Sequence, residues 1–181
     1  LVGGMEKVAT IKANYFTEVY GHEVIFVLTD QKSYNPFFSL SPKIKIINLD
    51  INFEDIRTNP LPIKIVRYYL KQFIYKKRLK RVLFRLKADI TISMLRREIN
   101  FITSIKDGSM KIGELQFNRD NYRDFNTTEN SFFLKRWAAK LWMNQLIKNL
   151  QKLDKFVVLS KEDFDNWPEI KHKTYIHNPI E

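Results

Sequence analysis

The sequence predicts an α/β fold: a Rossmann-like three-layer sandwich with a mostly parallel sheet, formed by residues 1–181 as one domain. Short apolar runs that suit buried strands alternate with longer amphipathic segments that suit helices. This order is typical of parallel βαβ units. The chain also has 181 residues and a hydrophobic fraction of 44%, so it can bury a core of its own.

The first amphipathic segment, residues 4–20, is predicted to be a helix that follows two adjacent glycines and ends at Gly21. Glycine takes the left-handed conformation of a helix C-terminus without steric cost. Residues 22–29 and 43–49 then suit strands, with His22 at a strand entry rather than in a ligand site. The inward side of the helix is expected to carry Met5, Val8, Ala9, Ile11, Tyr15, Phe16 and Val19. The opposite side is expected to carry Lys7, Thr10, Asn14 and Glu18.

A long basic helix is predicted over residues 63–87, which contain ten basic residues and no acidic one. Its apolar stripe is expected to cover the sheet. Two interpretations of its polar face stay open: this face binds an anionic membrane, or it is simply solvated. In the first interpretation, the membrane-binding cations are Lys71, Lys76, Lys77, Arg78, Lys80 and Arg81.

The second half of the chain continues the same alternation. Strands are predicted at 88–94, 111–117 and 155–159, with a short helix at 96–105 and a long helix at 132–153. The inward residues of the long helix are expected to be Trp137, Leu141, Trp142, Leu146 and Leu150. Ser160 is a predicted N-cap of a further short helix, because its hydroxyl can accept from a backbone N–H that lacks a helical partner.

Two segments are candidates for ligand binding. Gly3 and Gly4 precede a helix, where backbone N–H groups and the helix dipole favour an anion such as phosphate. The alternative is that the two glycines form only a tight connection, which is the more common use of Gly-Gly before a helix. The other segment follows the predicted strand 111–117, and parallel strands bind ligands beyond their carboxyl ends. The residues expected to bind a ligand there are Asn118, Arg119 and Tyr122.

Charge and composition narrow the classes of partner and chemistry. The net charge of +11 indicates an acidic partner, either nucleic acid or an anionic membrane, or a solubilising surface. The absence of cysteine excludes disulfides and thiol-based metal sites or nucleophiles. No metal site is predicted, because His22, His172 and His177 lack ligand spacing. No apolar run reaches the length of a membrane span.

Several motifs occur along nearly the whole chain in the order found in one enzyme family. They are Gly3-Gly4-x-Glu6-Lys7-Val8, Gly21-His22-Glu23-Val24, Lys87-x-Asp89 at a strand start, Val157-x-x-Ser160 and Asn178-Pro179. In this order they resemble the N-terminal domain of family 4 glycosyltransferases of the GT-B fold. Chains of that family typically open with a strand before the two glycines, so we expect this chain to be trimmed or partial there.

The resemblance implies a fold and an activity. The fold would be the acceptor-side, N-terminal half of GT-B, and a C-terminal nucleotide-sugar domain with two glutamates would follow Glu181. The full-length enzyme would be retaining and would move a sugar from a nucleotide-sugar to a glycan or lipid-linked acceptor. It would be bacterial, with no cofactor besides the donor. We expect it in the cytoplasm or at the inner face of the plasma membrane, and we expect residues 1–181 alone to be inactive.

The same resemblance implies where catalytic residues would lie. Many relatives carry a His at the end of the strand that corresponds to residues 112–117, where this chain has Glu114-Leu115-Gln116. Gln116 is the best-aligned residue, and its amide can hydrogen-bond a sugar but cannot take up a proton near neutral pH. Glu114 could supply a carboxylate, or it could balance a cation such as Arg119.

The alternative function is a basic Rossmann-like domain that binds nucleic acid by phosphate neutralisation and base stacking. No RRM, KH, zinc-finger or helix-turn-helix signature supports it, so nucleic acid is the less favoured partner. A regulatory dinucleotide-binding domain is a third hypothesis. It lacks a Gly-x-Gly-x-x-Gly fingerprint, since only Gly3 and Gly4 are present.

Overall fold

The computed structural model describes residues 4–30, 38–116 and 133–179, and in the last range it describes side chains from Lys140 onward. The chain divides into two compact units. The first is formed by Leu1–Val82 with Asn178–Glu181, and the second by Leu83–His177. Each unit contains a parallel sheet of its own, with two strands in the first and four in the second. The α/β class is therefore confirmed, whereas the single sheet that we predicted is replaced by two.

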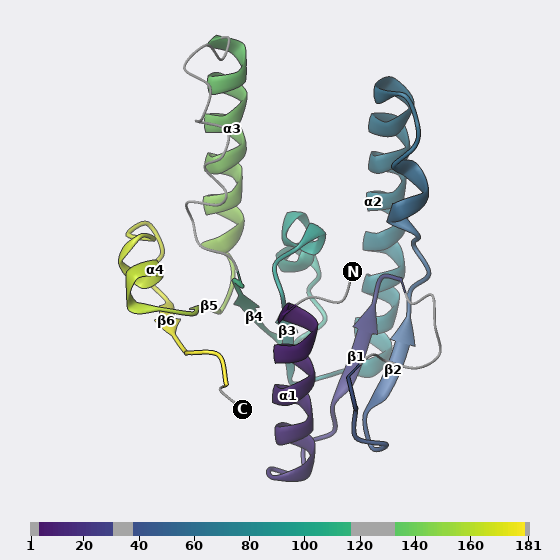
Figure 1. Cartoon of the computed structure of the whole chain (residues 1–181), viewed down its shortest axis with the longest axis vertical. Helices are drawn as coiled ribbons and strands as arrows, with labels where there is room; N and C mark the ends of the chain where they lie inside the picture. The colour runs from purple at the N-terminus through teal and green to yellow at the C-terminus, as the bar shows by residue number, and fades with distance from the viewer. Residues whose placement is uncertain (1–3, 31–37, 117–132, 180–181) are drawn as a thin grey trace. The chain divides into compact units, whose positions relative to one another are not determined.

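The first unit contains a parallel pair of strands and two main helices (Figure 1). The order is α1 (Gly4–Glu18), β1 (Ile25–Leu28), β2 (Lys45–Asn48), the 3-10 turn η1 (Phe53–Ile56) and α2 (Leu61–Leu86), whose last turn enters the second unit. Ile25 of β1 lies opposite Lys45 of β2, and Leu28 lies opposite Asn48. The strands are shorter than predicted, since each contains four residues.

The buried face of α1 agrees with the predicted face only at Val8. Its buried residues are Val8, Thr10, Ala13 and Thr17, whereas Tyr15 is 51% exposed. The last three buried residues are small and recur at intervals of three and four, which places them along one helix face. Hydrophobic periodicity missed this face because two of its members are threonines.

Asn14, which was predicted to lie on the outward side of α1, connects the helix to the loop before β2. Its Nδ2 donates to the carbonyl of Ser39 at 2.9 Å, and its Oδ1 accepts from the backbone N–H of Ser41 at 2.8 Å. This polar contact fixes the approach of the chain to β2.

Helix α2 buries only part of its apolar surface. Tyr75, Leu79 and Val82 are buried, and the ring of Phe53 from η1 contacts Tyr75 at 6.0 Å between centroids. In contrast, most apolar side chains of residues 61–74 are exposed. The expectation that the whole apolar stripe of this helix covers a sheet is therefore wrong for its first half.

The second unit is a four-stranded parallel sheet with helices and turns between the strands (Figure 1). In chain order it contains β3 (Ile90–Ser93), η2 (Arg97–Asn100), η3 (Ile102–Ser104), β4 (Met110–Glu114), α3 (Phe133–Leu150), β5 (Lys155–Val158), α4 (Lys161–Asp165) and β6 (Lys173–Tyr175). The strand order is β3-β4-β5-β6. Two 3-10 turns replace the short helix predicted at 96–105. The predicted cap is confirmed, since the Ser160 hydroxyl accepts from the N–H of Asp163 at 3.0 Å.

The core of the second unit is centred on β5. Phe156 and Trp167 are fully buried, and their rings meet edge to face at 5.6 Å. On α3, Leu146 and Leu150 are buried as predicted. The other described inward positions were predicted wrongly, because Leu141 is 47% and Trp142 is 44% exposed. The side chain of Trp137 lies outside the described part.

Gly113 allows β4 to pack closely against two leucines. A Cβ at this position would lie 2.5 Å from Cδ1 of Leu153 and 2.8 Å from Cδ2 of Leu95. Both leucines are buried, and the backbone of Leu95 is left-handed with φ 51°. A side chain at 113 would therefore push against residues that have little room to move, immediately before the candidate residue Glu114.

None of the helices in the described ranges is both long enough and apolar enough to cross a membrane.

Candidate functional site

The carboxyl edge of the second sheet is the place where its fold favours a ligand. Strands β3, β4, β5 and β6 are all parallel, so their last residues lie toward the same edge. In register, Ser93 of β3 pairs with Gly113 of β4, and Glu114 pairs with Val157 of β5. Open parallel sheets bind ligands beyond this edge. The polar residues here are therefore the first candidates for function.

Glu114 and Gln116 form a hydrogen-bonded pair at this edge. Nε2 of Gln116 donates to Oε1 of Glu114 at 2.5 Å, and Glu114 is only 6% exposed. Residues two apart on an extended chain point to the same side, and this contact confirms that they do. The carboxylate is thus an acceptor in a largely buried environment, and the amide is positioned by it. Both can hydrogen-bond a hydroxyl group of a ligand, and a role in catalysis stays a prediction.

The turn after β3 is organised by a carboxylate that the sequence analysis missed. Oε1 of Glu98 accepts from Oγ of Ser93 at 2.9 Å and from the N–H of Arg96 at 3.1 Å. The Ser93 hydroxyl in turn accepts from the N–H of Leu95 at 3.1 Å. Ser93 and Glu98 are five residues apart, and side chains at this spacing do not lie side by side in a regular helix or strand. Their contact depends on the left-handed Leu95, so no sequence signal was available for it.

Several predicted site residues are not part of this described edge. Gly3, Asn118, Arg119 and Tyr122 lie outside the described residues. Gly4 opens α1 in the first unit, whereas Gln116 belongs to the second unit. A Cβ built on Gly4 would have no atom within 4 Å, so there is space beside this helix start. A cleft shared by Gly4 and Gln116 stays a prediction.

Two of the predicted membrane-binding cations make contacts within the first unit. Nζ of Lys71 donates to the carbonyls of Ile51 and Asn52 at 2.6 and 2.7 Å. Arg78 donates to the carbonyls of Leu49 and Asp50 at 2.5 and 2.7 Å. These side chains satisfy backbone acceptors in the loop after β2, and we therefore remove both from the candidate lipid-binding set. Lys76, Lys77, Lys80 and Arg81 are exposed.

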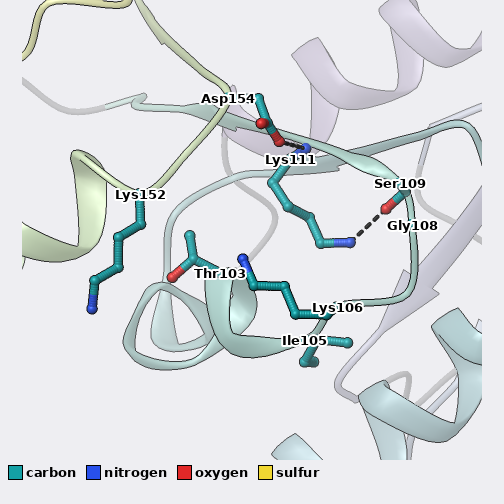
Figure 2. Close-up of a pocket in the computed structure, with 8 residues that line it drawn as sticks. All are labelled: Thr103, Ile105, Lys106, Gly108, Ser109, Lys111, Lys152 and Asp154. Carbon is teal, nitrogen blue, oxygen red and sulfur yellow. Dashed lines mark hydrogen bonds between the residues drawn. The ribbon is translucent and has the colours of Figure 1, made fainter.

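A polar pocket of about 310 Å³ lies at the opposite end of the second sheet, where β4 and β5 begin (Figure 2). Three lysines are among the residues that line it, namely Lys106, Lys111 and Lys152. The carboxylate of Asp154 accepts from the backbone N–H of Lys111 at 2.6 Å. This contact ties the start of β4 to the start of β5. The pocket is at the amino end of the strands, away from the edge that parallel sheets use for ligands.

The charge of Lys111 is already matched inside the protein. Its Nζ forms an ion pair with Asp107 and a hydrogen bond to Oγ of Ser109, and both charged side chains are almost completely buried. Burial by itself raises the pKa of Asp107. Hydrogen bonds from Lys111 and Ser109 outweigh that effect, and they hold the pKa below its ordinary value. We therefore interpret this corner as structural rather than as an anion site.

Within the described ranges, no group of three or more His, Cys, Asp or Glu side chains is arranged to hold a metal ion. Comparison with protein-family models and with curated proteins found no match.

Proposed function

We propose that this chain is the acceptor-side, N-terminal domain of a retaining GT-B glycosyltransferase similar to family 4. In the full-length enzyme, it would bind the glycan or lipid-linked acceptor while a second domain supplies the nucleotide-sugar. The observation that carries the proposal is the hydrogen-bonded pair of the buried Glu114 and the half-buried Gln116 at the carboxyl edge of a parallel sheet. The ordered motifs from Gly3-Gly4 to Asn178-Pro179 support it.

The chemistry of this pair suits a sugar ligand. A carboxylate accepts hydrogen bonds from hydroxyl groups, and an amide both donates and accepts. The Glu114 carboxylate has two oxygens and several acceptor positions, so it can accept from a ligand hydroxyl as well as from Gln116. We assign Gln116 to positioning the acceptor, since an amide cannot take up a proton near neutral pH. Glu114 would hold the acceptor hydroxyl through its carboxylate.

The test uses the full-length reading frame and a panel of nucleotide-sugars with a lipid-linked or glycan acceptor. Losing one buried hydrogen-bond partner costs about 1–3 kcal/mol, so Gln116→Ala is expected to lower kcat/KM about 5- to 150-fold. Gln151→Ala is the matched control. This exposed amide donates to the carbonyl of Glu169, and its loss is expected to leave turnover near the wild-type value.

Three results would contradict the proposal. One is sugar transfer by residues 1–181 alone, because the donor half would then be unnecessary. Another is a reading frame that continues past Glu181 without a second α/β domain. The third is equal turnover by the Gln116→Ala and Gln151→Ala enzymes, which would remove the pair from the acceptor site.

A further inference from the structure

The first half of α2 presents an apolar surface that no described part of the first unit covers. Six of its residues are 50–70% exposed: Leu61, Ile63, Val66, Tyr69, Leu70 and Phe73. A shallow apolar groove of about 360 Å³ adjoins them, between Ile56 and the start of the helix. Neighbouring exposed apolar side chains that form a patch are typical of surfaces that bind another protein or a membrane.

The outward side of α2 changes character along its length. Val66, Leu70 and Phe73 are spaced by four and three residues, so they lie on one side of the helix. The next positions on that side, again at three or four residues, are basic: Lys77 and then Lys80 and Arg81. The buried residues Tyr75 and Leu79 lie on the opposite side. An apolar half of about three turns is therefore followed by a cationic half.

All charged side chains of α2 are basic. Residues 61–86 contain nine basic side chains and no acidic one. Lys71 and Arg78 donate to loop carbonyls, which leaves seven, and all seven are exposed. The exposed apolar residues are thus accompanied by seven exposed cations on a helix that contains no acidic residue.

We propose that the outer side of α2 binds in the plane of an anionic lipid bilayer. Val66, Leu70 and Phe73 would enter the boundary between headgroups and acyl chains, and Lys76, Lys77 and Arg81 would contact lipid phosphates. Helices of this type bind with a strength that grows with the apolar area they bury and with their electrostatic attraction to anionic lipid. The helix binds the surface without crossing it, because none of the described helices has the length and apolarity of a span.

Lipid is favoured over the other occupants by side-chain type and charge. Nucleic acid would satisfy the cations but offers nothing to the aliphatic residues Val66 and Leu70, which have no ring for a base to stack on. A second copy packed on the same face would bring two sets of seven exposed cations together, and like charges repel. An anionic bilayer matches both halves of the helix. The inference is independent of the proposed glycosyltransferase activity.

The experiment measures partition of the 181-residue protein onto vesicles by co-sedimentation. We expect binding to vesicles with 30% phosphatidylglycerol, weak binding to pure phosphatidylcholine, and a decrease as salt is raised. Leu70→Gln with Phe73→Gln leaves the charge unchanged and is expected to lower partition at least tenfold. Lys77→Gln with Arg81→Gln keeps the apolar residues and is expected to lower it about 25-fold, at roughly fivefold per cation.

Matched controls test whether binding depends on this surface or on exposed apolar residues and cations elsewhere in the protein. Ile90→Gln with Ile92→Gln removes two comparably exposed apolar residues of β3, and Lys106→Gln with Lys152→Gln removes two exposed cations of the second unit. Both control proteins are expected to bind within twofold of wild type. Far-UV circular dichroism and thermal melting verify that each variant is folded.

Three outcomes would overturn the proposal. Unchanged partition of the Leu70→Gln, Phe73→Gln protein would show that the apolar residues do not contact lipid. Salt-sensitive binding to single-stranded RNA that is tighter than binding to the anionic vesicles would identify nucleic acid as the partner. A dimer in sedimentation equilibrium that this same variant dissociates would identify a second copy.

Discussion

Gly113→Ala is expected to destabilise the second unit by overpacking rather than by removing a contact. The new Cβ would lie 2.5 Å from Leu153 and 2.8 Å from Leu95, whereas ordinary van der Waals contacts begin near 3.4 Å. Extra methylenes in a packed core cost about 1–3 kcal/mol. Replacing glycine also lowers the conformational entropy of the unfolded chain, and this stabilises the folded state by about 0.4–1 kcal/mol. We therefore expect a net loss of about 1–2 kcal/mol, or roughly 2–8 °C in Tm for a chain of this size.

Urea unfolding followed by tryptophan fluorescence measures this loss, because Trp167 is fully buried against Phe156. Gly4→Ala is the matched control, since a Cβ there meets no atom within 4 Å. The double change Gly113→Ala, Leu153→Ala should cost less than the sum of the single changes, because the nearest methyl is removed. An unchanged midpoint for Gly113→Ala, or strict additivity, would refute the reasoning.

Three further predictions concern stability. Lys111→Met should cost about 3–5 kcal/mol in urea unfolding, because it leaves the buried Asp107 carboxylate without its cation; adding Asp107→Asn should recover part of the loss, and no recovery would contradict the pairing. Because the pKa of Asp107 is lowered in the folded state, the pair stabilises the protein above the ordinary carboxyl pKa of about 3.9, and this contribution is lost as pH falls through the folded value. The melting temperature should therefore fall less steeply between pH 6 and pH 2 for Asp107→Asn than for wild type. Ser160→Ala should cost about 1 kcal/mol by removing the helix cap at Asp163, whereas Ser160→Thr should cost less.

The pattern of helices and strands could be predicted from the sequence, because hydrophobic periodicity reports which segments have a buried side. It does not report what covers that side. The exposed Phe73 and Trp142 have the spacing of core residues, yet neither is buried. Conversely, Thr10 is buried on α1, since small size mattered there more than hydrophobicity. The separation of strands into two sheets depends on pairing between distant segments, which periodicity does not contain.

The candidate site was predictable only where its geometry is local. Glu114 ends β4 and Gln116 follows two residues later, so strand geometry predicts that they point to the same side, and their hydrogen bond agrees with it. The contact of Ser93 with Glu98 requires a left-handed Leu95, a conformation that a leucine rarely adopts. Gln116 was reached through the resemblance to a family, and its function stays a prediction.

The contacts of Lys71 and Arg78 with the loop after β2 fix the rotation of α2 about its own axis. The two residues are seven apart, which is nearly two full turns, so they reach the same loop from points about 10 Å apart along the helix. Each donates to two carbonyls between Leu49 and Asn52. A shift of the helix by one residue would turn it by about 100° and break both sets of bonds. The loop therefore holds α2 in the one rotation about its axis that keeps Phe73 and Lys77 pointing outward.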